Sequence, residues 1–196
     1  MIVGLTGGIG SGKTTVANYF SKCNNVAIYI ADAEAKKLMH SSKIIQTKIT
    51  ALFGDLAYKD GILNRPYIGN IVFNDKEKLK ALNAIVHPAV KKDFKQFVLK
   101  NSDKAFIVYE SAILFESNSQ QDFDFIITVH VDLKTRVERI IKRDHITKEQ
   151  VFARINNQYK EDKKLLQSNY IIYNNLLEKT EFQVNYICKI LTEKLH

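Results

Sequence analysis

Eight residues near the start of the chain combine the residue types that bind phosphate groups. Residues 7–14 read Gly-Gly-Ile-Gly-Ser-Gly-Lys-Thr, a full match to G-x-x-x-x-G-K-[ST]. Glycines at this spacing let main-chain N–H groups turn inward around phosphate oxygens, where a Cβ would obstruct them. Lys13 is expected to reach the β- and γ-phosphates of a nucleotide, and the Thr14 hydroxyl to be one ligand of its Mg²⁺. We call residues 7–14 the phosphate loop, and we expect nucleotide contacts from Gly8, Ile9, Gly10, Ser11, Gly12, Lys13, Thr14 and Thr15.

The residues on either side supply the elements that position such a loop. The apolar run of residues 1–5 precedes it, and Val16, Tyr19 and Phe20 share one helical face after it. The helix N-terminus adds partial positive charge behind the loop. A Gly-rich turn that binds nothing is the alternative, and the order of strand, loop and helix weighs against it.

Four more apolar runs read as strands that alternate with helical patterns. These strands are expected at residues 26–31, 106–109, 125–131 and 170–173. Helical patterns dominate residues 33–100, interrupted by a turn at 59–62, and a closing helix is expected from 180 to 195. Such alternation predicts an α/β fold of three layers around a five-stranded parallel sheet, with ligands at the C-terminal ends of the strands.

Composition limits the class of protein further. The chain has 196 residues, 45% of them hydrophobic, which suits one α/β domain with insertions. No run approaches 18 apolar residues and no signal peptide precedes the first strand, so we expect a cytoplasmic protein that does not bind membranes. Cys23 and Cys188 are too few and too isolated for a metal site and read as small buried hydrophobes.

Net charge raises the question of nucleic acid. The chain has 29 basic and 21 acidic residues, a net charge of +8. The basic residues are spread through helical stretches, with no basic patch interleaved by aromatic residues. An anionic small-molecule substrate accounts for the charge more economically, so no nucleic-acid partner is expected.

The phosphate loop occurs in many NTPases, and other residues must narrow the reaction. The chain lacks the guanine-reading pattern N-K-x-D and the transport-ATPase pattern L-S-G-G-Q. A compact kinase needs an acid near the loop to orient an acceptor hydroxyl. It also needs a mobile arginine-bearing lid over the transferring phosphoryl group.

Asp32 is the candidate acid. It ends the second predicted strand, and the first βαβ unit should place that end beside the phosphate loop. Its carboxylate could accept the proton of the acceptor hydroxyl. Capping of the helix that begins with Ala33-Glu34-Ala35 is an open alternative.

Arg139 and Arg143 are the candidate lid arginines. They are four residues apart, so their guanidinium groups should project from one helical face toward one target, with Arg136 beside them. Solvated helix arginines with Glu138 and Asp144 as partners remain the alternative.

Taken together, these residues resemble the dephospho-CoA kinases, a family that uses ATP to phosphorylate the ribose 3′-hydroxyl of dephospho-CoA in the last step of coenzyme A synthesis. The resemblance runs nearly end to end and begins with Leu5-Thr6 and the phosphate loop. It implies that Asp32 is the catalytic base. The family element Asp-Ala-Asp reads Ile30-Ala31-Asp32 here, so its first acid is missing.

The resemblance also implies an acceptor site in a helical insertion. Residues 60–65, 71–73 and 82–88 are similar to the coenzyme A-binding insertion of the family, which implies substrate contacts for Arg65 and His87. Taken alone, a His before Pro is more often a packing residue at a helix boundary. Residues 112–116 correspond to the family's Pro-Leu-Leu-Phe-Glu with Ala in place of Pro, so Glu116 either lines the acceptor pocket or pairs with a neighbouring base.

Further positions are assigned by the same resemblance. Glu110 stands where the family often has an acid and could hold a water on Mg²⁺, or it is merely a strand-end acid. Arg139, Arg143 and Asp144 match the lid element Arg-x-x-x-Arg-Asp, and Arg154, Gln158 and Lys164 fit the spacing that follows. Asn174 is similar to an Asn that the family has near the adenine of the nucleotide, although Leu176 stands where the family commonly has Gly.

We therefore expect an ATP- and Mg²⁺-dependent dephospho-CoA kinase, favoured as a monomer, with Lys13, Asp32 and Arg139 as catalytic residues. Its parts are a nucleotide-binding core (1–59, 101–132 and 166–196), an acceptor-binding insertion (60–100) and a lid segment (133–165). Another nucleoside or nucleotide kinase of this fold is the closest alternative. A nucleic-acid-linked NTPase and an inactive binding protein are the others.

Overall fold

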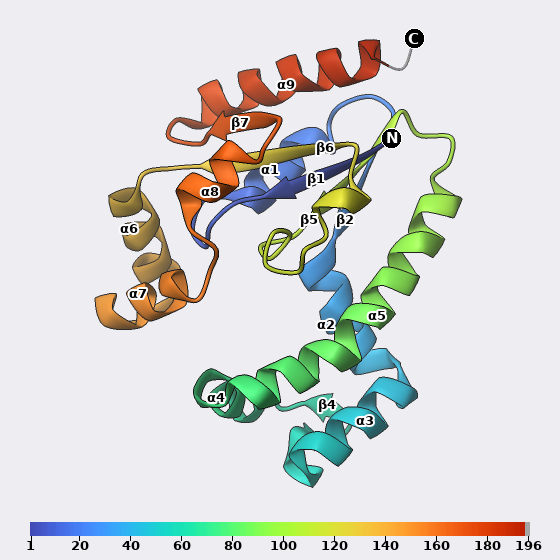
Figure 1. The fold of residues 1–196 in the computed structure, drawn as a ribbon, viewed down its shortest axis with the longest axis vertical. Coiled ribbons are helices and arrows are strands. Elements are labelled where there is room, and N and C mark those ends of the chain that lie inside the picture. Colours follow the sequence, from blue (N-terminus) through green and yellow to red (C-terminus); the bar gives the residue numbers. More distant parts are fainter. Residues whose placement is uncertain (195–196) are drawn as a thin grey trace. The chain divides into compact units, whose positions relative to one another are not determined.

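The structure, a computed structural model, describes residues 1–194 and divides the chain into two compact units. The first unit contains Met1–Ile30 and the chain from Asn101 onward, and the second contains Ala31–Lys100. Figure 1 shows the sheet in the first unit and helices with a short hairpin in the second. No described helix is long and apolar enough to cross a lipid bilayer.

A five-stranded parallel sheet forms the centre of the first unit, as predicted. Its spatial order is β2-β5-β1-β6-β7, and the strands are β1 (Ile2–Thr6), β2 (Val26–Ile30), β5 (Phe106–Glu110), β6 (Phe125–His130) and β7 (Tyr170–Tyr173). In register, Glu110 pairs with Leu5 on one side and with Ile30 on the other. The carboxyl ends of these strands therefore meet at one edge, where the phosphate loop leaves β1.

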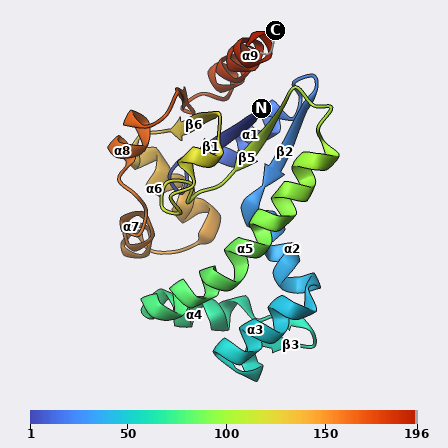
Figure 2. The ribbon, with the colours of Figure 1, turned by 45° about the vertical axis from the view of Figure 1, so that its right-hand side comes forward.

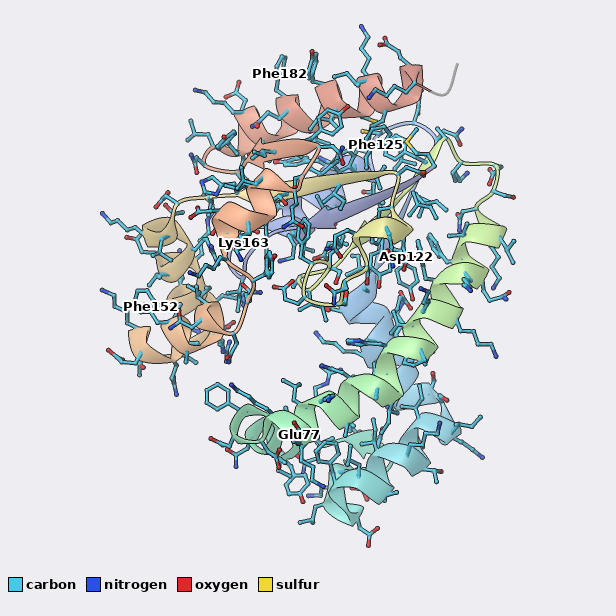
Figure 3. All side chains as sticks on the ribbon, in the orientation of Figure 1. Glu77, Asp122, Phe125, Phe152, Lys163 and Phe182 are labelled. Atoms are coloured by element: carbon cyan, nitrogen blue, oxygen red, sulfur yellow. The ribbon has the colours of Figure 1, made fainter. Side chains whose placement is uncertain are left out.

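Helices α1 (Lys13–Phe20) and α9 (Leu177–Glu193) pack with the sheet around one apolar core. Val16, Phe20 and Leu191 are fully buried there with β-strand residues such as Val3 and Ile127. The helix expected from residue 180 begins three residues earlier, and its expected end at 195 lies outside the described residues. Phe182 on α9 points away from the sheet and is exposed (Figure 3).

Three short helices follow β6 and make up most of the lid segment. They are α6 (Leu133–Asp144), α7 (Lys148–Asn156) and α8 (Glu161–Leu166), and Figure 2 shows them as one group in the first unit. Asp132 caps α6 by accepting the Thr135 N–H at 2.9 Å, and a capping box at Thr147 and Gln150 starts α7. The cluster of Val137, Ile140 and Val151 joins α6 to α7.

The second unit has its own small core. Its elements are α2 (Ala31–Ser41), α3 (Lys43–Phe53), η1 (Asp55–Ala57), β3 (Tyr58–Lys59), β4 (Ile62–Leu63), α4 (Arg65–Asn74) and α5 (Lys76–Lys100). The predicted turn joins β3 to β4 through Asp60 and Gly61, both with positive φ. Pro66 lies in the first turn of α4 behind an Asn64 cap. Ile45, Ile49, Phe53, Ala57 and Ile68 form the buried core.

The second unit includes residues that the sequence assigns to the nucleotide-binding core. It begins at Ala31, whereas the acceptor-binding insertion is expected from residue 60, because α2 and α3 both pack against α5. The alternative of a helix boundary at His87-Pro88 does not hold, since α5 continues through Pro88. Packing of α2, α3 and α4 along α5 holds this helix together despite the N–H that proline lacks.

Candidate active site

The phosphate loop runs from the end of β1 directly into α1. Gly10 and Gly12 have φ of +81° and +87°, a region that residues with a Cβ rarely adopt. Helix α1 begins at Lys13, so the N–H groups of its first turn lie next to the loop. Lys13 Nζ donates to the carbonyl oxygens of Gly7 at 3.0 Å and Gly8 at 3.5 Å, and Thr14 is exposed beside it. The loop thus has the local geometry that its sequence predicts.

Side chains from distant parts of the chain bind the outer side of this loop. Arg136 Nε donates to the Ile9 carbonyl oxygen at 3.0 Å, and Gln158 Oε1 accepts the Ile9 N–H at 2.8 Å. Asn174, only 2% exposed, donates from Nδ2 to the Ser11 carbonyl oxygen at 2.7 Å. When a side chain binds a loop carbonyl oxygen, the N–H of the following residue, in the same trans peptide, points to the opposite side of the backbone. Loop motifs in the sequence give no hint of these contacts.

Arg136 belongs to a buried polar network. It is 3% exposed, and its Nη1 forms an ion pair with Glu161, whose other oxygen lies 2.9 Å from His130 Nδ1. Burial lowers the pKa of Arg136, and burial followed by the Arg136 charge lowers the pKa of His130. Because a carboxylate only accepts, a neutral His130 must carry its proton on Nδ1.

Arg139 and Arg143 bind different partners, although one helical turn separates them. Arg139 Nη2 donates to the Asn174 carbonyl oxygen at 3.0 Å, and its Nη1 would lie 3.7 Å from a Cβ on Gly12. Arg139 therefore stands beside the phosphate loop. Arg143 instead holds Asp144 through two hydrogen bonds of 2.7 and 3.0 Å, which lower the pKa of Asp144, and Arg154 binds the same carboxylate at 2.6 Å.

The two acids of the predicted site occupy contrasting surroundings. Glu110 ends β5 at the edge where the phosphate loop begins and is only 4% exposed. Asp32 is exposed and is the second residue of α2, so it does not occupy the capping position that the sequence left open. Along the chain it follows the end of β2 by two residues. Its carboxylate in the first helical turn interacts favourably with the helix dipole.

Glu116 pairs with a base, which is one of the two alternatives that the sequence leaves open. Lys164, 1% exposed, donates to Glu116 Oε1 at 2.8 Å, and the Tyr159 N–H donates to the same oxygen at 2.8 Å. Glu116 Oε2 is buried without a hydrogen-bond partner. The pair joins the loop after β5 to α8. Figure 3 labels Lys163, the residue of α8 that precedes Lys164.

Arg65 and His87, the predicted acceptor contacts, both lie in the second unit. Arg65 is the first residue of α4 and His87 lies within α5, and both are exposed. Partial desolvation by neighbouring side chains lowers the pKa of His87. Exposure of both groups leaves them accessible to an anionic ligand.

Comparison with known proteins identifies the family. A sequence model described as dephospho-CoA kinase matches residues 1–179. The chain is 36% identical over 190 residues to the dephospho-CoA kinase of Listeria innocua, covering 93% of this chain and 92% of the relative. It is 32% identical over 194 residues to that of Bacteroides fragilis, covering 99% and 94%. The chain belongs to the dephospho-CoA kinase family.

Solved structures agree with this membership. A dephospho-CoA kinase from Campylobacter jejuni matches with a TM-score of 0.71 at 25% identity, covering 100% of this chain and 98% of that one. The protein TT1252 from Thermus thermophilus matches with a TM-score of 0.84 at 28% identity and the same coverage. Shikimate kinase from Acinetobacter baumannii, at 14% identity and a TM-score of 0.54, shares the fold. The chain is thus a kinase that phosphorylates dephospho-CoA with ATP in coenzyme A biosynthesis.

Proposed function

We propose that this dephospho-CoA kinase transfers the γ-phosphoryl group of ATP to the ribose 3′-hydroxyl, with Asp32 as base and Lys13 and Arg139 on the transferring group. The observation that carries the proposal is the arrangement of side chains around the phosphate loop. Arg136 and Asn174 donate to carbonyl oxygens of the loop, and Lys13 and Arg139 lie beside it. This arrangement concentrates N–H groups and cations where phosphate charge develops.

The donor half of the site consists of residues 8–15. Loop amides and Lys13 bind the β- and γ-phosphates. Arg143 of the lid segment and Asn174, which follows β7 in the core, are the further nucleotide contacts. Described residues contain no group of three or more His, Cys, Asp or Glu side chains that could hold a metal ion. This suits Mg²⁺, which binds largely through substrate phosphates and a few hard oxygens. The exposed Thr14 hydroxyl would supply one such oxygen, and the Glu110 carboxylate would hold a water on the ion, which would neutralise phosphate charge when bound.

The acceptor half combines Asp32 with groups of the predicted insertion. Asp32 is exposed and does not cap the helix, so its carboxylate can accept the 3′-hydroxyl proton. Arg65 and His87 are accessible donors for the pyrophosphate of the acceptor. Glu116 is proposed to line the acceptor pocket, and its buried Oε2 has no hydrogen-bond partner within the protein. The lid segment is proposed to close, bringing Arg143 to join Arg139 and excluding water that would hydrolyse ATP.

The remaining parts of the proposal concern assembly and location. We propose a monomer in the cytoplasm, with the core (1–59, 101–132 and 166–196), the insertion (60–100) and the lid segment (133–165) as its functional parts. Residues 31–59 of this core pack within the second compact unit. No nucleic-acid or membrane partner is required, because both substrates are small anions.

Incubation of the purified enzyme with ATP, Mg²⁺ and dephospho-CoA, followed by mass detection of coenzyme A, tests the reaction. Fragmentation of the product locates the new phosphate on the 3′-oxygen. Lys13→Ala should abolish transfer while circular dichroism shows a retained fold, because the loop loses its one lysine. Full activity of this variant would refute the assigned donor site, whereas a product phosphorylated elsewhere would refute the 3′ assignment.

A further inference from the structure

Both polar backbone groups of Ile9 are bound by side chains of the lid segment. Arg136 Nε binds its carbonyl oxygen at 3.0 Å, and Gln158 Oε1 binds its N–H at 2.8 Å. Neither side chain belongs to the phosphate loop, and neither takes part in the transfer proposed above. We propose that Arg136 and Gln158 are positioning residues, which orient the peptide groups of the phosphate loop for ATP.

The argument rests on the geometry of trans peptides. In a trans peptide, the C=O of one residue and the N–H of the next point in opposite directions, and no described peptide bond is cis. Arg136 binds the Ile9 carbonyl and thereby turns the Gly10 N–H to the opposite side of the backbone. Gln158 binds the Ile9 N–H and thereby turns the Gly8 carbonyl inward, where it accepts from the Ser11 N–H at 3.1 Å and from Lys13 Nζ at 3.5 Å.

A third contact repeats this arrangement two residues later. Asn174 Nδ2 binds the Ser11 carbonyl at 2.7 Å, which turns the Gly12 N–H away from Asn174. The Asn174 side chain is itself fixed, because Thr180 Oγ1 donates to its Oδ1 at 3.0 Å. The peptide groups of the loop therefore take their orientation from donors and acceptors outside the motif.

Arg136 has little freedom to move. Its Nη1 pairs with Glu161, and Glu161 lies 2.9 Å from His130 Nδ1 at the end of β6. A Cβ on Gly8 would lie only 2.2 Å from Arg136 Nη2, so the guanidinium fills the space beside the loop. Glu161 compensates the buried positive charge, which would otherwise be costly.

We call Arg136, Gln158 and Glu161 the Ile9 clamp, and all three belong to the lid segment. Arg136 lies in α6, Gln158 between α7 and α8, and Glu161 at the start of α8. A displacement of this segment would therefore displace the Ile9 peptide groups. The affinity for ATP is thereby coupled to the position of the lid segment, a consequence that rests on the proposed function only in taking ATP as the ligand of the loop.

Replacement of Gln158 isolates the Ile9 clamp with conservative changes. Gln158→Leu removes the acceptor, whereas Gln158→Glu keeps an oxygen for the Ile9 N–H. Gln150→Leu is the matched control, because Gln150 Oε1 also accepts a backbone N–H, that of Thr147 at 3.0 Å, in the same segment but away from the loop. Binding of a non-hydrolysable ATP analogue is measured by calorimetry without acceptor, and the KM values for ATP and dephospho-CoA are measured separately.

We expect Gln158→Leu to weaken analogue binding by about 5- to 10-fold, the scale of one lost hydrogen bond. The KM for ATP should rise and that for dephospho-CoA should not. The Ile9 amide should exchange faster with deuterium. Gln158→Glu should keep the slow exchange of this amide, and Gln150→Leu should stay near wild type in all three measurements. Equal effects of all three variants, or unchanged binding and exchange in Gln158→Leu, would overturn the proposal. Because the calorimetry uses no acceptor, these outcomes are separate from any failure to form coenzyme A.

Discussion

Asp32 is the residue whose chemistry is easiest to isolate. Asp32→Asn keeps the shape of the side chain but removes the basic carboxylate, so kcat should fall by roughly 10²- to 10⁴-fold. The Kd for ATP should change little, because the proposed partner of Asp32 is the acceptor. Rapid-quench turnover assays and calorimetry measure the two effects. A variant that retains near-normal kcat would remove Asp32 as the base.

Lys164 tests a different property of a single residue, its burial beside Glu116. Lys164→Met leaves the carboxylate without its cation, which should lower the free energy of unfolding by about 3 kcal/mol. We take the low end of the usual range because Glu116 retains 21% side-chain exposure. Lys189→Met is the control, since its pair with Glu193 is exposed and should contribute under about 1 kcal/mol. Urea unfolding compares them, and equal losses would contradict the assigned role of burial.

The phosphate loop as an element depends on close packing as well as on backbone freedom. Gly8→Ala places a Cβ 2.2 Å from Arg136 Nη2, which Ile9 and Glu161 hold in place. We expect a loss of about 1–3 kcal/mol in stability and weaker ATP binding. Gly69→Ala is the opposite case, because it meets nothing within 4 Å inside α4 and should stabilise by about 0.5–1 kcal/mol. Thermal melts with and without ATP would show a contradiction if both variants behaved alike.

At the scale of elements, the sequence predicted the strands and the phosphate loop. It did not predict which distant side chains bind the loop. Strands and the phosphate loop were predicted because apolar runs and glycine spacing are local properties. The contacts of Ile9 with Gln158 and Arg136 join residues 149 and 127 positions apart. Helical periodicity shows that Arg136, Arg139 and Arg143 lie on neighbouring faces, but the choice of Ile9, Asn174 or Asp144 as a partner depends on tertiary packing.

For the whole molecule, the sequence predicted the family and the parallel sheet, but not where the second unit begins. That boundary depends on α2 and α3 packing against the distant α5. The division into two units also shows where the net charge of the chain lies. Residues 31–100 contain 13 basic and 7 acidic residues, so this unit has a net charge of +6 out of the total of +8.

This uneven charge predicts how the kinase responds to salt. If the second unit binds the anionic acceptor, the KM for dephospho-CoA should rise several-fold between low and high ionic strength, because mobile ions screen exposed charges. The KM for ATP should rise less, since contacts to loop amides and the partly buried Lys13 are screened less. Initial rates in KCl from about 20 to 300 mM at constant Mg²⁺ measure both, and a neutral osmolyte controls for viscosity. An equal rise in the two KM values would place the acceptor-binding charge outside the second unit.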